Sequence, residues 1–316
     1  MRFRSLALAA LIAAPVLAQA GAPQQPAQAP GWYRMMVGDI EVTALSDGTV
    51  GLPIDQLLQR TSPQKVKSAL AKWRLGLPVE TSVNGYLVNT GSKLVLIDAG
   101  AGSLFGPTLG KLVANLKAAG YTPEQVDEIY ITHMHPDHVG GLAADGQAVF
   151  PNATVRADQA EADFWLSAAN LEAAPKESKG FFQGAQASLK PYVDAGRFKA
   201  ITADGTLVPG VGSLATHGHT KGHRNYVVES QGQKLVLWGD LMHVAAVQFA
   251  TPAVTIAFDT DQNAALAQRR KAFADAAKQG YAIGASHLSF PGIGTLRAEG
   301  TGYVFQPTNY TTQLKK

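Results

Sequence analysis

The chain has 316 residues, of which 46% are hydrophobic, and this is enough apolar material for a large buried core. Such a composition excludes global disorder. Lys and Arg number 27 against 24 Asp and Glu, a formal net charge of +3, which gives no reason to expect nucleic acid or an anionic membrane as a partner. There is no cysteine, so disulfides and thiolate metal sites are excluded.

The N-terminus has the pattern of a secretory signal peptide. Two basic residues, Arg2 and Arg4, precede an apolar stretch from Leu6 to Leu17, and Ala18-Gln19-Ala20 is a small-x-small cleavage site. The apolar run is too short to span a membrane comfortably. We therefore expect export to the periplasm or outside the cell, with no membrane span in the mature form. The expected divisions are a signal peptide over residues 1–20, a flexible lead-in over 21–31 and one folded domain over 32–316.

Strand-like and helix-like patterns alternate along the rest of the chain. Polar residues follow several of the strands, which is how a rigid scaffold presents loop residues to a shared site. Gly120 is the expected stop of a helix, and Gly232 suits the turn of a hairpin. In chain order we expect strands over 41–46, 83–90 and 94–97, a helix over 107–119, a strand over 126–132, a helix over 158–169, a strand over 212–216, a hairpin of 226–229 with 234–238, a helix over 261–279 and a strand over 281–285.

All eight histidines lie in four short clusters, each of which follows a strand-like segment. His133 and His135 alternate, so that in an extended loop both imidazoles face the same way and suit one metal ion. Asp137 and His138 follow the turn at Pro136 and can face a second, neighbouring ion. This density of nitrogen and oxygen ligands predicts a site for zinc or a related divalent metal, rather than a run of solvated polar residues.

The run from Thr132 to His138 resembles the His-x-His-x-Asp-His motif of the metallo-β-lactamase superfamily, and further motifs follow in the family's order over residues 32–312. The resemblance implies an α/β (α+β) fold, a four-layer αββα sandwich. It implies that Asp98 orients metal ligands. It also implies that His219 completes the first metal site, that Asp240 bridges both sites and that His287 completes the second.

These residues together predict two Zn²⁺ ions per chain, although other divalent metals fit the same ligands. Paired ions about 3.5–4 Å apart turn water into hydroxide near neutral pH and stabilise the attacking and leaving oxygens. We expect hydrolysis by attack of that hydroxide on a carbonyl or phosphoryl centre, with Asp137 and Asp240 among the catalytic residues. The expected metal ligands are His133, His135 and His219 for the first ion, Asp137, His138 and His287 for the second, and Asp240 between them.

Three histidines remain outside this set. His217 is expected to support the site rather than bind metal, and His223 to hydrogen-bond within its own loop. His243 follows Asp240 by three positions. It is a candidate catalytic residue that lines the pocket and orients the substrate or donates a proton. A loop histidine bonded to backbone is the alternative for His243.

Segments between the metal motifs resemble the methyl parathion hydrolase branch of the family, with its lactonase and aryl esterase relatives. The resemblance implies a homodimer and an aromatic substrate pocket, although core packing is the alternative role of the aromatic rings. Ile256 and Phe258 are bulkier than their counterparts in that branch and are expected to narrow the pocket. The candidate substrate-binding residues are Phe105, Trp165, Phe181, His243, Ile256 and Phe258.

A narrow slot fits a planar lactone better than a tetrahedral phosphotriester. The leading hypothesis is a dizinc metallohydrolase in which a metal-bridging hydroxide attacks the carbonyl of a lactone or aryl ester such as dihydrocoumarin, with organophosphate hydrolysis as a side activity. The alternative within enzymes is a dedicated phosphotriesterase of the methyl parathion hydrolase type. The alternative of another class is an inactive metal-binding protein on the same scaffold.

Overall fold

The computed structural model describes residues 22–314, and the expected signal peptide over residues 1–20 lies outside them. Residues 22–31 form no helix or strand, and the first element begins at Trp32. Among the described residues, no helix combines the length and the apolarity that crossing a membrane requires.

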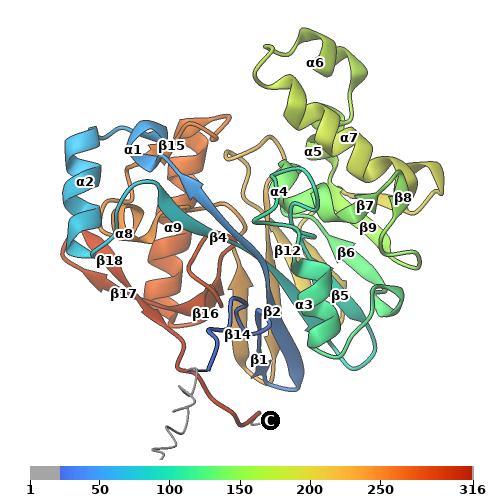
Figure 1. Ribbon diagram of the computed structural model, residues 1–316, viewed down its shortest axis with the longest axis horizontal. Helices are drawn as coiled ribbons and strands as arrows, with labels where there is room; N and C mark the ends of the chain where they lie inside the picture. Colours follow the sequence, from blue (N-terminus) through green and yellow to red (C-terminus); the bar gives the residue numbers. More distant parts are fainter. Residues whose placement is uncertain (1–21, 315–316) are drawn as a thin grey trace, which may run out of the picture.

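Two seven-stranded sheets pack face to face in the middle of the described part of the molecule (Figure 1). The first sheet has the order β1-β2-β4-β5-β6-β9-β10, with bounds Trp32–Val37, Ile40–Leu52, Val79–Asn89, Leu94–Ile97, Glu128–Tyr130, Thr154–Asp158 and Phe198–Ile201. The second has the order β11-β12-β13-β14-β16-β17-β18, with bounds Gly205–Val208, Val211–Ala215, Arg224–Ser230, Gln233–Leu237, Ala282–Gly284, Ile293–Glu299 and Gly302–Pro307. Two short pairs accompany them, β3 (Leu58–Gln59) with β15 (Thr255–Ile256) and β7 (Ala143–Ala144) with β8 (Gln147–Ala148).

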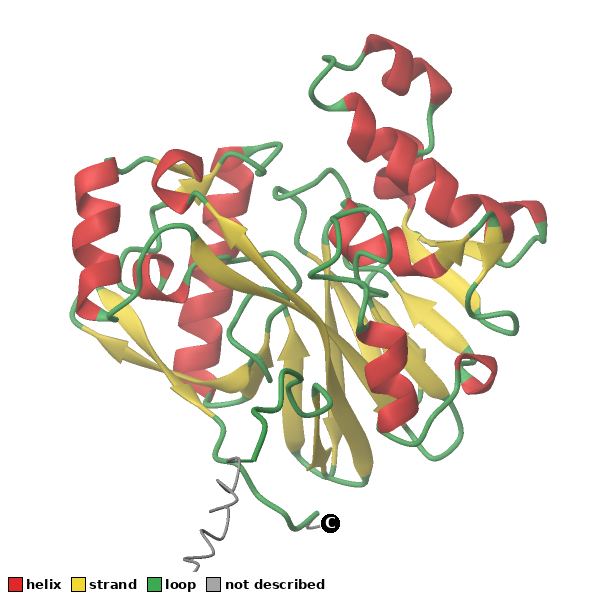
Figure 2. Ribbon diagram, in the orientation of Figure 1, coloured by secondary structure: helices red, strands yellow, loops and turns green. Residues whose placement is uncertain are grey.

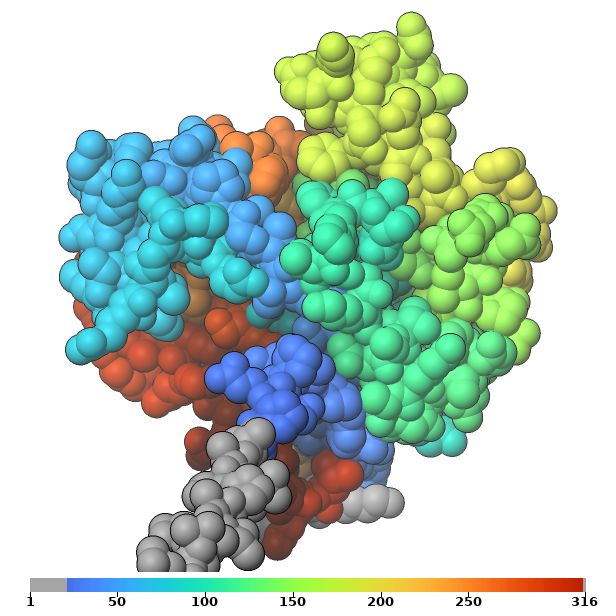
Figure 3. Space-filling model, viewed as in Figure 1, coloured from blue at the N-terminus to red at the C-terminus, as the bar shows by residue number. Residues whose placement is uncertain are grey.

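Helices lie on the outer faces of both sheets (Figure 2). Helices α3 (Leu112–Ala118), α5 (Gln159–Trp165) and α7 (Lys179–Asp194) cover the first sheet, and α9 (Gln262–Gln279) covers the second. This arrangement confirms the predicted αββα sandwich. The shorter helices are α1 (Ile54–Leu57), α2 (Pro63–Lys72), α4 (Pro136–Val139), α6 (Ala168–Ala173) and α8 (Ala245–Gln248), with 3-10 turns at Pro123–Gln125 and Gly140–Leu142. In Figure 3 the segment of α5 to α7 rises as a lobe above the rest of the surface.

Strand β5 shows why the sequence of a central strand is apolar throughout. Val95 and Ile97 belong to the cluster between the two sheets, whereas Leu94 and Leu96 belong to the cluster between the first sheet and its helices. Successive side chains of a strand point to opposite faces, and here both faces are covered. The strand over 94–97, which was predicted from its apolar run, is therefore buried on both sides.

The predicted helix over 107–119 is wrong at its start, since α3 begins only at Leu112. The carboxylate of Asp47 accepts hydrogen bonds from the backbone N–H groups of Gly110 and Leu112 (2.9 and 3.0 Å), and also from that of Ala101 (2.9 Å). Gly110 has a φ of +79°, which a helix cannot contain. The segment before Leu112 is consequently a loop held at both ends by one buried carboxylate.

The predicted helix over 158–169 is two helices. Helix α5 begins at Gln159 with Asp158 as its N-cap, close to the predicted start, but it ends at Trp165. Ser167 then caps α6, with its hydroxyl accepting a hydrogen bond from the N–H of Asn170 (3.2 Å). Serine favours N-caps because its side chain replaces the missing intrahelical acceptor. The break turns the chain toward α6 and α7, an outcome that helical periodicity alone does not predict.

Two other predicted elements agree closely with the structure. The hairpin of β13 and β14 turns at Gln231 and Gly232, whose φ values of 50° and 74° are those of a type I′ turn. Helix α9 ends at Gln279 as predicted, and Asp261 is its N-cap, accepting hydrogen bonds from the N–H groups of Asn263 and Ala264.

We expect Leu96→Ala to reduce the free energy of unfolding by about 3 kcal/mol, because the change opens a cavity in a fully buried cluster. Leu214→Ala, on an exposed strand position, is the matched control and should cost less than about 1 kcal/mol. Guanidinium unfolding of both variants at saturating zinc measures the difference. Equal losses would contradict the burial of β5 on both faces.

Candidate metal centre and substrate pocket

The candidate site lies where several strands end at one edge of the sandwich. In the first sheet β5 and β6 are parallel, so that Asp98 and the loop from Thr132 to His138 leave them at the same edge. In the second sheet β14 and β16 are parallel, which places Asp240 and His287 together in the same way. The carboxyl ends of parallel strands are a common place for ligand sites.

The first group of candidate ligands contains three histidines and an aspartate. The ligand atoms of His133, His135, His219 and Asp240 all lie within 4.8 Å of one another, and all four residues are buried. Asp240 Oδ2 lies 3.3 Å from His219 Nε2 and 3.6 Å from His133 Nε2. His135 Nδ1 lies 3.2 Å from His219 Nε2.

The second group contains Asp137, His138 and His287, whose ligand atoms also lie within 4.8 Å of one another. Asp240 reaches this group as well, with Oδ1 3.3 Å from His138 Nε2 and Oδ2 3.2 Å from His287 Nε2. Asp137 Oδ2 lies 3.5 Å from the Nε2 atoms of both histidines. The structure thus brings together all seven residues proposed from the sequence as metal ligands, with Asp240 between the two groups.

The chemistry of the donor atoms fits a pair of divalent cations. Within residues 22–314, the buried atoms His133 Nε2, His138 Nε2 and Asp240 Oδ1 have no hydrogen-bond partner. Each such unpaired atom costs about 1–3 kcal/mol when it is buried. Neutral imidazoles and carboxylates in sets of three or four are the ligands that zinc takes in catalytic sites. A bound cation would satisfy these atoms.

The electrostatics divide the candidate histidines into two sets. Burial would lower the pKa of His138, His219 and His287, but Asp240 and neighbouring carboxylates raise that of His219 to about 9 and those of His138 and His287 above the usual value. Burial lowers the pKa of His133 well below its usual value and that of His135 to about 3, so both rings are neutral, as metal ligands must be. Burial would raise the pKa of Asp240, but the surrounding imidazoles lower it well below its usual value. The site is therefore a buried carboxylate surrounded by nitrogen donors.

The outward-facing nitrogens of three candidate ligands are held by hydrogen bonds. His138 Nδ1 lies 2.8 Å from Asp98 Oδ2, His219 Nδ1 lies 2.8 Å from Asp259 Oδ1, and His287 Nδ1 lies 2.9 Å from the carbonyl oxygen of Ser82. Each contact fixes the ring with its Nε2 toward Asp240. Such supporting contacts orient metal-binding histidines. Asp98, which the sequence proposed for this role, has a φ of 58°, an uncommon value for a residue other than glycine.

The loop with the first histidine cluster is packed tightly against the loop after β5. Its continuation contains Gly140 and Gly141, where an added Cβ would lie 2.1 Å from the carbonyl oxygen of Ala101 and 2.0 Å from that of Ala99. Ala99 also donates its N–H to the carbonyl oxygen of His138 (2.8 Å). Only glycine permits this approach, which fixes the distance between Asp98 and His138.

His217 and His223 lie outside both groups of candidate ligands. The side chain of His217 is 45% exposed, and its Nε2 lies 3.0 Å from Asp158 Oδ2. His223 is buried between two loops, with Nδ1 2.9 Å from Thr216 Oγ1 and Nε2 accepting the N–H of Asp240 at 3.0 Å. His223 therefore bonds within its loop, as expected, and in addition holds the backbone of the central aspartate.

Glu161 is a supporting residue that sequence reasoning did not identify. It is fully buried on α5, and its carboxylate accepts hydrogen bonds from Met134 N (2.8 Å), Thr220 Oγ1 (2.7 Å) and Gly222 N (2.7 Å). Met134 lies between His133 and His135, whereas Thr220 follows His219. One carboxylate thus joins the two loops that supply the first group of ligands, and no spacing in the sequence indicates this.

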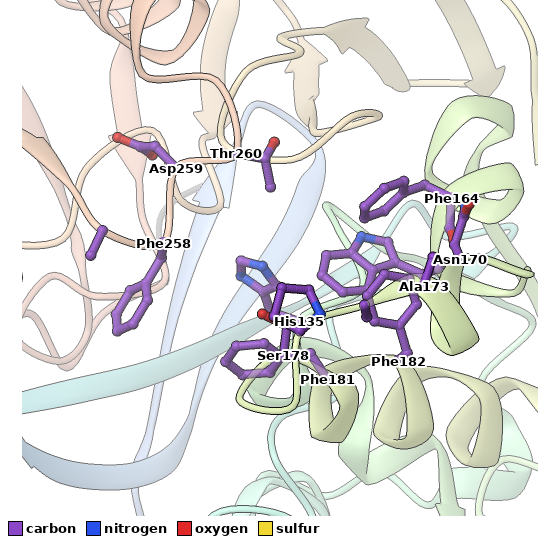
Figure 4. Close-up of a pocket in the computed structure, with 14 residues that line it drawn as sticks. His135, Phe164, Asn170, Ala173, Ser178, Phe181, Phe182, Phe258, Asp259 and Thr260 are labelled. Atoms are coloured by element: carbon purple, nitrogen blue, oxygen red, sulfur yellow. The ribbon is translucent and has the colours of Figure 1, made fainter.

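Two cavities meet at the candidate metal centre. A small cavity of ≈ 60 Å³ is lined by four of the seven candidate ligands, His135, Asp137, Asp240 and His287, and a larger one of ≈ 390 Å³ lies beside it. Both are lined by His135, Phe181 and Phe258. In Figure 4, Phe258 lies on one side of His135, and Phe164 of α5 and Phe182 of α7 lie on the other. The larger cavity is lined by Phe164, Trp165, Asn170, Ala173, Ala174, Pro175, Ser178, Phe182, Ala257, Asp259 and Thr260 besides the three shared residues.

Five of the six proposed pocket residues line these cavities. Phe105 and His243 line the small cavity, Trp165 lines the large one, and Phe181 and Phe258 line both. Phe105 is 38% exposed, so core packing does not explain this ring.

Ile256 lines neither cavity, and the expectation that it narrows the pocket directly needs correction. It pairs with Leu58 between β15 and β3, and it is fully buried in a separate apolar cluster with Ile54 and Val254. Its bulk therefore acts on the pocket indirectly, through the loop that continues to Phe258 and through the cluster against which Phe258 packs.

His243 is oriented toward the candidate ligands rather than toward backbone. Its Nε2 lies 3.0 Å from Asp240 Oδ2, and its ring stacks on that of His287 with centroids 5.0 Å apart. Within the described residues, neither ring nitrogen of His243 has a hydrogen-bond partner of good geometry, although the ring is buried. The alternative of a loop histidine with its ring bonded to backbone is therefore wrong.

Comparisons with known proteins agree with this fold. Residues 78–281 match the model of the Metallo-beta-lactamase superfamily. A crystal structure of the hydrolase AbOPH in the beta lactamase superfamily has a TM-score of 0.86 and 41% sequence identity, and the match covers 90% of this chain and 100% of that one. The chain therefore belongs to the metallo-β-lactamase superfamily.

Two lactonases are among the similar proteins. The structure of AidC, described as a dizinc quorum-quenching lactonase in complex with the product N-hexanoyl-L-homoserine, has a TM-score of 0.83 and 26% identity over 89% of this chain and 99% of that one. An N-acyl homoserine lactonase of Bacillus cereus is 32% identical over 127 residues, which is 40% of this chain. The match spans 42% of the length of that curated relative.

We expect Glu161→Gln to lower both the free energy of unfolding and the retention of metal, because an amide cannot accept all three hydrogen bonds that the carboxylate accepts. The loss should be about 2–3 kcal/mol, given that one or two buried donors lose their acceptor. Glu172→Gln, at an exposed position of α6, is the matched control. Denaturant unfolding and metal analysis after dialysis measure both effects, and a variant that keeps full metal content would contradict the supporting role.

Proposed function

We propose that the protein is a dizinc lactonase that hydrolyses lactones, and related aryl esters, carrying an apolar group. The observation that carries the proposal is the continuity of the two cavities, one lined by candidate metal ligands and one by aromatic rings. The similarity to AidC and to the N-acyl homoserine lactonases supports the lactone class. Export and the homodimer stay predictions from the sequence.

The first ion would be held by His133, His135 and His219 and the second by Asp137, His138 and His287, with Asp240 reaching both. When bound, two such ions supply hydroxide near neutral pH and act as Lewis acids for the carbonyl and leaving oxygens. The role of the protein is to hold and orient the substrate against that centre and to limit the access of water.

The reacting ring of the substrate would lie at the small cavity and extend toward the larger one, since ≈ 60 Å³ holds only about two water molecules. Leu52, Leu109 and Phe105 line it opposite the candidate ligands, so a flat ring can pack on apolar side chains while its carbonyl faces Asp240 and His243. His243, whose nitrogens have no good partner among the described residues, offers one N–H to the carbonyl or leaving oxygen. Asp137 also lines the cavity, where the carboxylate oxygen that does not face His138 and His287 can take up a proton.

The larger cavity fits the apolar group of the substrate. A chain attached to the ring would pass between Phe181 and Phe258, which line both cavities, and reach Trp165, Phe164 and Phe182. Burying apolar surface is worth about 25 cal/mol per Å², so each added methylene should strengthen binding by roughly 0.8 kcal/mol until the cavity is filled. An N-acyl homoserine lactone and dihydrocoumarin both present a lactone ring with apolar surface attached.

We expect the protein to hydrolyse N-hexanoyl-L-homoserine lactone and dihydrocoumarin with a kcat/KM at least about tenfold above that for methyl parathion, because a flat ring suits the small cavity better than a tetrahedral phosphotriester. A substrate panel on metal-analysed protein measures the ratio. Prolonged chelation should abolish every activity, and added Zn²⁺ should restore it. A higher kcat/KM for methyl parathion would favour a phosphotriesterase, and no turnover by metal-loaded protein would favour an inactive scaffold.

We expect Phe258→Leu to raise the rate of phosphotriester hydrolysis roughly tenfold, because a smaller side chain widens the passage that both cavities share. Phe164→Leu, which enlarges only the larger cavity, is the matched control and should leave that rate nearly unchanged. Steady-state kinetics with methyl parathion compare the two variants. If both raise the rate equally, the width of the shared passage does not limit it.

A further inference from the structure

Asp259 contacts both the candidate metal centre and the wall of the substrate cavity. It is buried, and its Oδ1 accepts the hydrogen bond from Nδ1 of His219 (2.8 Å). Its Oδ2 accepts the N–H of Ile256 (3.1 Å), which bends the chain so that Ala257 and Phe258 lie between the two bonded residues. Phe258, Asp259 and Thr260 all line the larger cavity. One carboxylate thus holds a candidate ligand with one oxygen and the cavity wall with the other.

The buried guanidinium of Arg269 stabilises the carboxylate of Asp259. Arg269 of α9 is fully buried, with Nη2 3.5 Å from Asp259 Oδ2. Its Nε donates to the carbonyl oxygen of Leu241 (2.6 Å) and its Nη1 to that of Val254 (2.7 Å). Leu241 directly follows Asp240. Val254 lies two residues before Ile256, where the cavity wall begins. The guanidinium therefore connects the central aspartate, the wall and Asp259.

The backbone adds two further links between the same loops. The N–H of Thr260 donates to the carbonyl oxygen of His219 (2.8 Å), and the N–H of Asp261 donates to that of Gly218 (2.9 Å). The segment from Ile256 to Asp261 and the loop with His219 are thus bonded at three successive positions, residues 259, 260 and 261. A shift of His219 cannot occur without a shift of the cavity wall.

We propose that Asp259 is a positioning residue that couples metal binding at His219 to the shape of the apolar cavity, so that each favours the other. The inference rests on the proposed function for its metal and its apolar ligand. Coupling between two sites is reciprocal: a metal ion that holds His219 in place tightens binding in the cavity, and a ligand in the cavity slows the loss of metal. Asp259→Asn keeps the size of the side chain but replaces one acceptor oxygen by an amide nitrogen, which cannot accept from both partners.

Asp98 provides the matched comparison within the same chain. It supports His138 as Asp259 supports His219, at the same distance of 2.8 Å. Its other hydrogen bonds go to the N–H and hydroxyl of Thr132, and neither Thr132 nor His138 lines the larger cavity. Asp98→Asn should therefore weaken metal binding without changing the cavity. Asp261→Asn, at the neighbouring N-cap, controls for a general disturbance of the loop.

The test measures the binding of an uncharged apolar fluorophore, N-phenyl-1-naphthylamine, to each variant with and without saturating Zn²⁺. We expect zinc to tighten binding at least threefold in the wild type, in D98N and in D261N, and to leave it unchanged in D259N. The reciprocal measurement is the rate of zinc loss to a chelator. The fluorophore should slow that loss in the wild type and not in D259N. Asp259→Glu, which retains a carboxylate, is the second variant should D259N fail to fold, and it should restore part of the coupling.

Kinetics separate this inference from the proposed function. In the wild type and in D98N, KM should fall from N-butanoyl to N-decanoyl homoserine lactone, whereas in D259N at saturating zinc this dependence should flatten. Zinc-dependent fluorophore binding without any lactone hydrolysis would refute the lactonase and leave the coupling supported. An equal effect of zinc on fluorophore binding in D259N and the wild type would overturn the coupling, whatever the substrate.

Discussion

The structure depends on one electrostatic constraint, the burial of many lone pairs around Asp240. Five histidines place an Nε2 atom within 3.0 to 3.6 Å of its carboxylate oxygens. His287 Nδ1 faces the carbonyl oxygen of Ser82, which can only accept, so this nitrogen carries the proton and Nε2 of the neutral ring carries a lone pair. A lone pair facing a carboxylate repels it. Positive charge stabilises the arrangement, either as protons on His138, His219 and His287, whose pKa values the carboxylates raise, or as bound cations, which the set of nitrogen and oxygen donors fits.

The geometry of the two sheets brings these charged residues together at one place. Parallel strands β5 and β6 in one sheet, and β14 and β16 in the other, deliver their loops to a single edge. The loops then adopt backbone that regular structure does not allow, such as the φ of 58° at Asp98 and the contact between Gly141 and Ala99. Strained backbone of this kind persists only where many surrounding contacts hold it in place. The core between the sheets and beneath the helices supplies that rigidity.

The parts that the sequence predicts well are those set by local chemistry. The apolar run of β5, the glycine turn after β13 and the dense cluster from His133 to His138 each carry their own signal. The four-layer fold and the distant ligands His219, Asp240 and His287 followed from the order of motifs, since their spacing along the chain says nothing about their distance in space.

The features that the sequence did not predict are determined by residues far away along the chain. Helix α3 starts late because of Asp47, a residue 65 positions before Leu112. Glu161 and Asp259 look like ordinary acidic residues of a helix and a loop, and only burial against the ligand loops reveals their support. Ile256 is expected in the pocket because the branch of the family that the chain resembles has a pocket residue at that position. Pairing with Leu58 instead directs it into a separate core cluster.

The same short segments both support the metal centre and shape the substrate cavity. Helix α5 contributes Glu161 to the ligand loops and, one turn later, Trp165 to the cavity. In the segment from Ile256 to Asp261, Asp259 hydrogen-bonds to His219, and Phe258 lines both cavities. A substitution that reshapes the cavity at these segments therefore also disturbs the ligands, whereas Phe181 and Phe182 on α7 line the cavity from an element that supplies no candidate ligand. Changes of substrate preference should be tolerated most readily on α7, because there the cavity can vary while the charges around Asp240 stay balanced.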